Sequence, residues 1–325
     1  MRSAVHQTFG EPAEVLALAK SAVPEPGPRQ VRIKTILSPI HNHDLWTVRG
    51  QYGYKPDLPA IGGSEAVGVV DALGPDVTGI SVGQRVAVAG VHGSWAEYFL
   101  ASAGGLVPLP DAIPDEAAAQ LIAMPFSAIT LLDFLGVESG DWVIQNTANG
   151  AVGKTLAMLA KARGINVVNL VRRDAGIEEL ALVGIGNAVS TASGSWKDTV
   201  RSLVGDASIK AAVDSIGGKA SSDLIGLLGE NGLLVSFGTM GGEPMQIPSG
   251  DVIFKQAVVK GFWGSKVSAA MPAPKRAALI GELLQLVVSG ELKLPVEAVF
   301  DLAQISEAVK ASLTPGKTGK VLLRP

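Results

Sequence analysis

Apolar and polar positions in the first hundred residues alternate in short runs that glycine and proline interrupt, which is typical of β-strands joined by tight turns. The clearest expected strands are Gln30–Ile36, Glu65–Leu73, Gln84–Ala89 and Trp95–Ala101. Helical periodicity is scarce in this part of the chain. The pattern therefore predicts a β-rich unit, barrel-like or sandwich-like, in the N-terminal part.

From Asp115 onward the pattern changes to helices and strands in alternation. Six strands are expected, at Trp142–Asn146, Asn166–Val171, near Ala188, Ala211–Asp214, Leu233–Phe237 and Ala257–Phe262. Helices are expected between them, over Gly153–Arg163, Ile177–Val183, Lys197–Val204 and Ala220–Leu228. Because parallel strands need crossover connections and helices must cover both faces, this order predicts an α/β domain with a doubly wound parallel sheet.

The residues after Met271 form a tail that is too short for a third domain. Its expected elements are a helix at Pro274–Ser289, a strand near Val299, a helix at Ile305–Ser312 and a strand at Lys320–Leu323. We expect this tail to complete the first domain. The predicted domains are therefore 1–121 together with 268–325, and 122–267, which suits a chain of 325 residues.

Composition narrows the possible partners. The 27 basic and 30 acidic residues give a net charge of −3 and are scattered, which argues against a nucleic-acid or membrane partner and favours a small-molecule substrate. Cysteine is absent, which excludes disulfides, thiolate nucleophiles and Cys-built zinc sites. The N-terminus has no apolar signal segment, and the longest uncharged run, 117–132, is short for a bilayer span, so a cytoplasmic protein is expected.

The first strand of the alternation runs into TANGAVGKT at the start of a helix. Glycines there allow close approach of the backbone to a pyrophosphate and close packing of helix on strand, and the helix N-terminus supplies free N–H groups. The spacing GxxG is looser than GxGxxG, so the alternative is a turn that only closes a strand-helix corner. The cofactor-binding residues expected from this turn are Ala148, Asn149, Gly150, Val152 and Gly153.

The next strand ends where a dinucleotide site places its ribose-reading residue. An NAD site has an acidic residue there, whereas this chain has Arg172 and Arg173. Guanidinium groups are suited to a 2′-phosphate, so NADPH is predicted as the cofactor. The alternative is that both arginines are ordinary solvated surface charges.

The chain resembles the medium-chain dehydrogenase/reductase superfamily over nearly its whole length, in GGSEAVGVVDALGPDVTGISVGQRV, the ANGAVG turn and IFKQAVVKGFW. Within its zinc-free branch, RGQYGYKPDLPAIGGSEAVGVV, DWVIQNTANGAVGK and KGFWGS look like the mitochondrial-type enoyl thioester reductases, with quinone oxidoreductases as near relatives. The resemblance implies a GroES-like catalytic domain built from both chain ends, a Rossmann cofactor domain, a homodimer, and an active site in the cleft between domains.

The resemblance also implies two catalytic residues. Tyr52 in GQYGY matches the catalytic tyrosine of the enoyl thioester reductases, and Trp263 matches a tryptophan that lines their substrate cleft. A phenol can donate a hydrogen bond to an enolate or relay a proton without itself carrying a charge. Tyr54 lies close by, and the alternative for Tyr52 is an aromatic side chain packed in a loop. Trp46 is expected to be buried, the alternative being that it faces the cleft, and His92 has no assignable partner.

A zinc site is the competing interpretation of the same superfamily. The places of the catalytic zinc ligands in its alcohol dehydrogenases correspond approximately to His41, Ser64 and Pro125, of which only the histidine binds metals. A zinc ion would have to be held by His41, His43, Asp44 and Glu65, and the alternative is that these polar groups line a cleft wall and form hydrogen bonds with the backbone or substrate. Because the chain has no cysteine and no histidine at position 64, no metal is expected.

The leading prediction is an enzyme, an NADPH-dependent reductase of activated C=C bonds such as 2-enoyl thioesters. An NADPH quinone oxidoreductase is the first alternative. A zinc-type alcohol dehydrogenase and a non-catalytic dinucleotide-binding protein are further alternatives.

Overall fold

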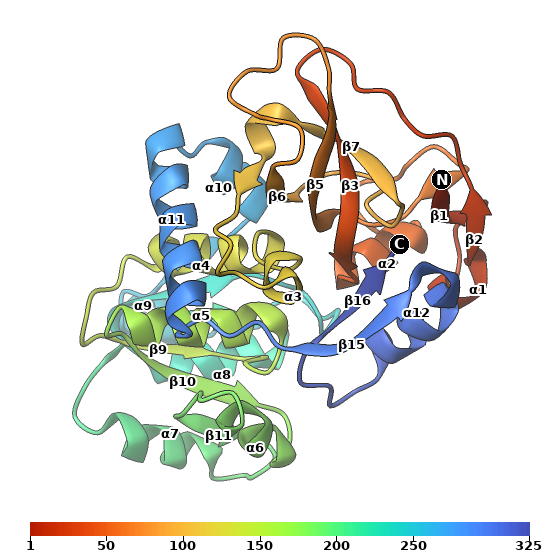
Figure 1. The fold of residues 1–325 in the computed structure, drawn as a ribbon. Helices are drawn as coiled ribbons and strands as arrows, with labels where there is room; N and C mark the ends of the chain where they lie inside the picture. The colour runs from red at the N-terminus through yellow and green to blue at the C-terminus, as the bar shows by residue number, and fades with distance from the viewer. The chain divides into compact units, whose positions relative to one another are not determined.

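The computed structural model describes residues 1–325 and divides into two units, one formed by Met1–Ala123 with Leu294–Pro325 and the other by Met124–Lys293 (Figure 1). The tail does return to the first unit, but only from Leu294. The predicted boundary at 268 differs because helix α11 (Ala273–Ser289) groups with the second unit. There its Glu282 pairs with Arg163, 2.8 Å away.

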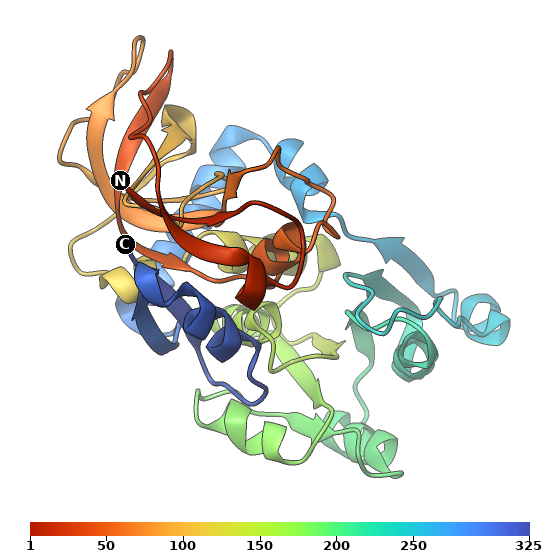
Figure 2. The ribbon, with the colours of Figure 1, turned by 90° about the vertical axis from the view of Figure 1, so that its right-hand side faces the viewer.

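The first unit is organised around strand β3 (Gln30–Pro39), which pairs antiparallel with β5 (Glu65–Leu73), β7 (Tyr98–Ser102) and β16 (Lys320–Arg324). Its seven-stranded sheet is completed by β6 (Arg85–Ala89), β8 (Val107–Pro108) and β15 (Val296–Asp301). The two chain termini lie close together in this unit (Figure 2). The β-rich architecture predicted from the alternating runs is thereby confirmed.

Most of the smaller elements of this unit were not predicted. A three-stranded sheet joins β1 (Arg2–His6), β2 (Leu16–Lys20) and β4 (Ala60–Ile61). The helices are α1 (Pro12–Val15), α2 (Asn42–Val48), α3 (Asp115–Ala118) and α12 (Ile305–Leu313), with 3₁₀ turns η1 (Ala103–Gly105) and η2 (Leu302–Gln304). Of these, only α12 was expected.

Alternation along β3 explains how this unit forms its core. Val31 and Ile33 are fully buried and pack with Ala66 and Val70 of β5. Residues between them, such as Arg32, face outward, and its guanidinium pairs with Asp71 at 2.6 Å. One face of the sheet is therefore apolar and the other charged, as period-two patterning requires.

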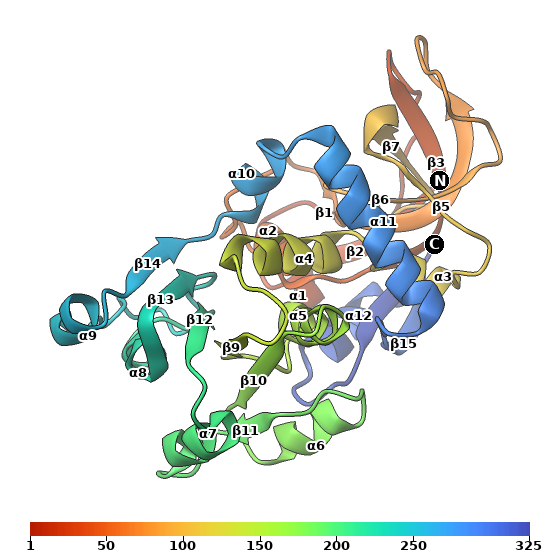
Figure 3. The ribbon, with the colours of Figure 1, turned by 90° about the vertical axis from the view of Figure 1, so that its left-hand side faces the viewer.

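The second unit contains one parallel sheet of six strands in the order β11-β10-β9-β12-β13-β14 (Figure 3). The strands are β9 (Trp142–Gln145), β10 (Asn166–Val171), β11 (Ala188–Ser190), β12 (Ile209–Asp214), β13 (Leu228–Ser236) and β14 (Val258–Gly261). The predicted doubly wound sheet is thus confirmed. Strand β9 lies between β10 and β12, and ligands of such sheets bind outside the carboxyl ends of the strands at this switch point.

Five helices connect successive strands of this sheet: α5 (Ala151–Ala162), α6 (Ala175–Ala181), α7 (Trp196–Val204), α8 (Lys219–Leu227) and α9 (Ser249–Phe254). Helix α4 (Ala123–Leu135) precedes the first strand, and α10 (Gly264–Ala269) follows the last. The core beneath them contains Ile144, Val168 and Leu234, all fully buried. No helix is long and apolar enough to cross a membrane.

Candidate functional site

The turn between β9 and α5 has room only for glycine at one position. A Cβ atom at Gly153 would lie 2.8 Å from the Cα and carbonyl oxygen of Ala148 and from the carbonyl oxygen of Thr147. Helix α5 begins after Gly150, and no side chain caps it. Its first backbone N–H groups are therefore available to an anion, as expected of a phosphate-binding turn.

The same turn is fixed from two sides. The N–H of Ala148 donates to the carbonyl of Leu170 in β10, 3.2 Å away, so the turn is tied to the neighbouring strand. The side-chain amide of Asn149 donates to Glu179 of α6 at 3.4 Å. Val152 lies in the first turn of α5. All five turn residues expected to bind the cofactor thus gather at the carboxyl end of β9.

The two arginines that follow β10 differ in their surroundings. Arg173 is paired with Glu179 at 2.6 Å, whereas the exposed Arg172 forms no ion pair. Sequence reasoning missed Glu179, although an acidic residue one to two helical turns after Arg173 is a possible signal. Arg172 is consequently the guanidinium that is free to meet a 2′-phosphate.

A buried carboxylate shapes the neighbouring loop, and sequence reasoning missed it too. Asp214, at the carboxyl end of β12, is fully buried and accepts a hydrogen bond from the side-chain amide of Asn146 at 2.7 Å. The same oxygen accepts the N–H groups of Ile216 and Gly217 at 2.9 and 3.1 Å. The loop after β12 is therefore held in a fixed shape beside the β9 turn.

Tyr52 lies in the loop between α2 and β4 of the first unit, with 46% of its surface exposed. Its ring lies beside that of His43, with centroids 5.8 Å apart and planes tilted by 31°. The loop begins at Gly50. Its φ of +72°, and the 2.9 Å that would separate a Cβ atom there from the Phe9 ring, require glycine. The phenol is thus accessible, and the ring of His43 packs beside it.

Tyr54, the second tyrosine of this loop, has a different partner. It stacks on His92 with centroids 4.2 Å apart and planes at 17°. This contact assigns a partner to His92, which the sequence did not provide. The loop therefore carries two tyrosines, each beside its own histidine.

A hydrogen-bond chain runs inward from His43. Its Nε2 atom lies 2.7 Å from the Oγ atom of Ser64, and this hydroxyl donates to Oδ1 of Asp44 at 2.6 Å. Asp44 also accepts the backbone N–H of His41 at 3.0 Å, which fixes the start of α2. The imidazole of His43 is thereby linked to a buried carboxylate.

Beneath this chain, His41 and Glu65 form a fully buried pair, with Nε2 and Oε2 2.6 Å apart. Burial holds the pKa of His41 well below 6.5 and raises the pKa of Glu65 to about 7. Nearby, burial lowers the pKa of Lys320 to about 8, although Asp44 and Glu65 oppose this shift. The pair consequently shares one proton near neutral pH.

These residues do not fit a zinc ion. No group of three His, Cys, Asp or Glu side chains stands together so that it could hold a metal ion. The Nε2 atom of His41 is already bonded to Glu65, and Ser64 and Pro125 supply no ligand at the other two places. The chemistry of this site is therefore assigned to the side chains alone.

Trp263 follows β14 and precedes α10 in the second unit, with 70% of its surface exposed. The preceding Phe262 is buried against Phe134 and Phe237, with ring centroids 5.3 and 5.9 Å away. This packing anchors the strand end and leaves the indole accessible. The expectation that Trp46 is buried was wrong: it is 48% exposed, with Arg49 beside its ring.

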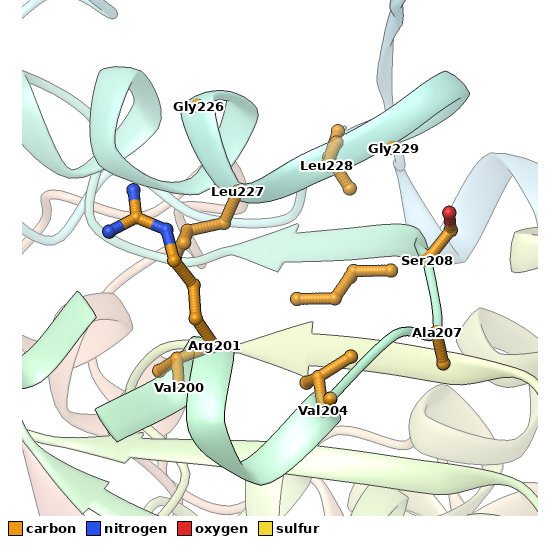
Figure 4. A pocket seen from close by; sticks show the side chains of 11 residues that line it. Val200, Arg201, Val204, Ala207, Ser208, Gly226, Leu227, Leu228 and Gly229 are labelled. Carbon is orange, nitrogen blue, oxygen red and sulfur yellow. The ribbon is translucent and has the colours of Figure 1, made fainter. Parts of the chain in front are cut away.

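A pocket of about 180 Å³ lies elsewhere in the second unit (Figure 4). One wall is the end of α7 with the loop that leads into β12, including Arg201 and Val204, and the other is the end of α8 with the start of β13, including Leu227 and Leu228. This is the amino end of β12, opposite the end that carries Asp214. Because ligands of doubly wound sheets bind at carboxyl ends, this pocket is not the nucleotide site.

Known proteins share both units. Residues 27–111 match the alcohol dehydrogenase GroES-like domain and residues 151–278 the zinc-binding dehydrogenase domain. The human mitochondrial enoyl-[acyl-carrier-protein] reductase is 32% identical over 99% of this chain and 88% of its own length. A mycobacterial quinone oxidoreductase is 26% identical, with a TM-score of 0.86 and full coverage of both chains. A mycobacterial structure solved with NADPH is 25% identical, with a TM-score of 0.87 and the same coverage.

Proposed function

Because this chain belongs to the medium-chain dehydrogenase/reductase superfamily and is related to its enoyl reductases and quinone oxidoreductases, we propose that it reduces activated C=C bonds with NADPH. The proposed substrates are 2-enoyl thioesters. Sequence identity near 30% to these relatives supports the reaction class. The choice of substrate is argued from the residues of the site.

The observation that carries this proposal is the accessible phenol of Tyr52 beside His43. Reduction of an enoyl thioester needs a group that stabilises negative charge on the carbonyl oxygen and supplies a proton to the α-carbon. A neutral phenol can do both. A residue used only for packing would instead be expected to bury its ring.

The proposed cofactor, NADPH, supplies the hydride that is added to the β-carbon. The chain's own residues would hold its pyrophosphate at the uncapped start of α5 and its 2′-phosphate at Arg172. Gly153 keeps the helix close to the turn. Trp263 is proposed to line the substrate site. Among these features, Arg172 supports NADPH over NADH, because only NADPH carries the 2′-phosphate.

The second candidate function is NADPH-dependent quinone reduction, favoured by the similarity to the mycobacterial quinone oxidoreductase. A quinone takes its charge on an oxygen that water can protonate, so it needs no proton-donating tyrosine. An alcohol dehydrogenase of the zinc type is disfavoured by the donor set at His41, Ser64 and Pro125.

We also propose a homodimer formed through β14. This strand is the edge of the parallel sheet, and its Val258 and Val259 are exposed, as is Phe254 of the preceding α9. An exposed apolar edge strand invites pairing with another chain. Two copies related by a two-fold axis would cover the same patch on each other.

The cellular location stays a prediction. The sequence favours the cytoplasm, whereas the name of the human relative places that protein in mitochondria.

The function is tested by steady-state rates of the purified chain with saturating NADPH. The substrates are crotonyl and longer 2-enoyl thioesters, 9,10-phenanthrenequinone, and, with NADP⁺, a primary alcohol. We expect the largest kcat/KM for an enoyl thioester. Quinone reduction without thioester reduction would favour the second candidate, and alcohol oxidation alone would exclude both.

A further inference from the structure

The loop with the two tyrosines offers an internal comparison. Tyr52 lies beside His43 and Tyr54 beside His92, so both rings have a histidine neighbour. Only His43 continues into a hydrogen-bond chain, through Ser64 to Asp44. Asp44 is 4% exposed, whereas no carboxylate contacts His92. The two histidines therefore differ in what they can do for their tyrosines.

The chain fixes the proton positions on His43. The Ser64 hydroxyl has one proton, which it donates to the Asp44 carboxylate, so it can only accept from the imidazole. The Nε2 atom of His43 must therefore carry a proton, in the neutral ring as well as in the imidazolium. The Nδ1 atom makes no hydrogen bond within the protein, so it is the ring nitrogen that the chain through Ser64 leaves unused, on the imidazole whose ring lies beside that of Tyr52.

Other titratable groups lie close to His43. His41 stacks on His43 with ring centroids 5.0 Å apart. It stays neutral because burial holds its pKa well below 6.5. The Oδ1 atom of Asp44 lies 3.5 Å from Nε2 of His43, close enough for the carboxylate to balance the charge that the ring gains with a second proton. The remaining titratable neighbours of this cluster are Glu65 and Lys320.

We propose that His43 is the positioning residue for Tyr52, holding the phenol and returning its proton through Nδ1 after each turnover. The chain of Asp44 and Ser64 keeps the ring in the orientation and protonation pattern that this step needs. This role rests on the proposed enoyl thioester reduction, in which Tyr52 must regain its phenol proton after each turnover.

The proton balance of this step is closed. Tyr52 gives its phenol proton to the α-carbon, where the electron pair of the enolate forms the new C–H bond. The phenolate then takes the Nδ1 proton of the His43 imidazolium. A proton from water restores the imidazolium, since the side chain of His43 is 26% exposed. The sum is the uptake of one hydride and one solvent proton by the substrate.

The experiment compares His43→Phe with the matched control His92→Phe, using crotonyl thioester, 9,10-phenanthrenequinone and saturating NADPH. Phenylalanine keeps the ring contact but removes both nitrogens. We expect His43→Phe to lower kcat for the thioester by about 10- to 100-fold, less than the loss of a general acid itself. KM should change by less than about threefold, and the solvent deuterium isotope effect on kcat should rise because the proton return limits the rate. His92→Phe should leave all three within about twofold.

A readout without turnover tests the hydrogen-bond chain directly. In the wild-type protein, ¹⁵N NMR of the histidine rings should show the neutral His43 protonated at Nε2, and Ser64→Ala should produce a mixture of the two tautomers. Unchanged kcat and isotope effect in His43→Phe, equal losses in both phenylalanine variants, or a neutral Nδ1–H tautomer in the wild type would each overturn the inference. A wild-type protein inactive on thioesters would instead refute the proposed function.

Discussion

The Nη2 atom of Arg173 lies 2.6 Å from Oε1 of Glu179, and the other oxygen of this carboxylate accepts a hydrogen bond from Asn149. Glu179 of helix α6 thus links one of the two adjacent arginines to Asn149 in the turn between β9 and α5. The other, Arg172, remains free.

This division predicts different effects of two neighbouring substitutions. Arg172→Ala should weaken NADPH binding by about 10- to 100-fold, because it removes charged hydrogen bonds worth about 1.5–3 kcal/mol, and should barely change NADH binding. Arg173→Ala should weaken both cofactors by a similar, smaller factor, since it loosens the turn. Fluorescence titration measures both. Equal loss of NADPH and NADH in Arg172→Ala would contradict the assignment.

The close packing at Gly153 predicts a steric effect. Gly153→Ala places a methyl group 2.8 Å from the backbone of Ala148 and Thr147, which should cost about 1–3 kcal/mol of stability and weaken NADPH. Gly281→Ala in helix α11 is the matched control, because a Cβ there meets nothing within 4 Å. The control should be stabilised by about 0.4–1 kcal/mol. Urea unfolding that ranks the two variants equally would be inconsistent with this packing.

The buried pair of His41 and Glu65 predicts a pH effect that appears only when the pair is broken. Between pH 4.5 and 6.5 the unfolded pair holds one proton on the histidine, and the folded pair holds one on the carboxyl, because burial lowers the first pKa and raises the second to about 7. The two contributions to stability therefore cancel in this window. Lys320 titrates above it, with a pKa of about 8.

In Glu65→Gln only the lowered pKa of His41 remains. The folded state then has its full stability above pH 6.5 and loses stability as the pH falls, because the unfolded histidine takes up a proton that the buried one does not. The free energy of unfolding should drop, relative to the wild type, by up to about 1.4 kcal/mol per pH unit below that point. His41→Asn should behave oppositely, losing stability as the pH rises from 4.5 through about 7. Parallel pH profiles for wild type and both variants would show that the pair does not share a proton.

The donor set at His41, Ser64 and Pro125 predicts metal independence. Elemental analysis should find no stoichiometric zinc, and 1,10-phenanthroline should leave NADPH-dependent activity unchanged, because no three suitable side chains stand together. A zinc alcohol dehydrogenase treated in parallel is the positive control. Activity that is lost on chelation and restored only by zinc would refute this part of the account.

Much of the fold could be predicted because periodicity and turn residues are local signals. Five strands of the parallel sheet and the strands β5 and β6 begin and end close to their expected residues. Strand β13 begins five residues earlier than expected, at Leu228, and β3 ends three residues later, at Pro39. The short helix α2 was not predicted, because its seven residues carry little periodicity and its start depends on a capping contact between His41 and Asp44. The structure divides the chain at Leu294 and not at 268, and the ion pair of Arg163 with Glu282 joins helix α11 to the second unit across 119 positions, a contact that no local pattern displays.

The candidate site could be predicted only as individual residues. Gly153 and Arg172 follow from their places after strands, which the sequence displays. The partners of these residues come from tertiary contacts: Ser64 reaches His43 from 21 positions away, and Asp214 reaches Asn146 from 68. No local pattern encodes such pairs, so the hydrogen-bond chain behind Tyr52 was visible only in the structure.

The most direct test of the central claim is kcat of Tyr52→Phe with crotonyl thioester at saturating NADPH. Tyr54→Phe, in the same loop, is the control, and cofactor titration establishes that NADPH binding is intact. The account predicts that Tyr52→Phe lowers thioester reduction by about 10²- to 10⁴-fold and that Tyr54→Phe changes it by less than about threefold. Unchanged thioester reduction in Tyr52→Phe, with normal NADPH binding, would contradict the account and leave quinone reduction as the better assignment.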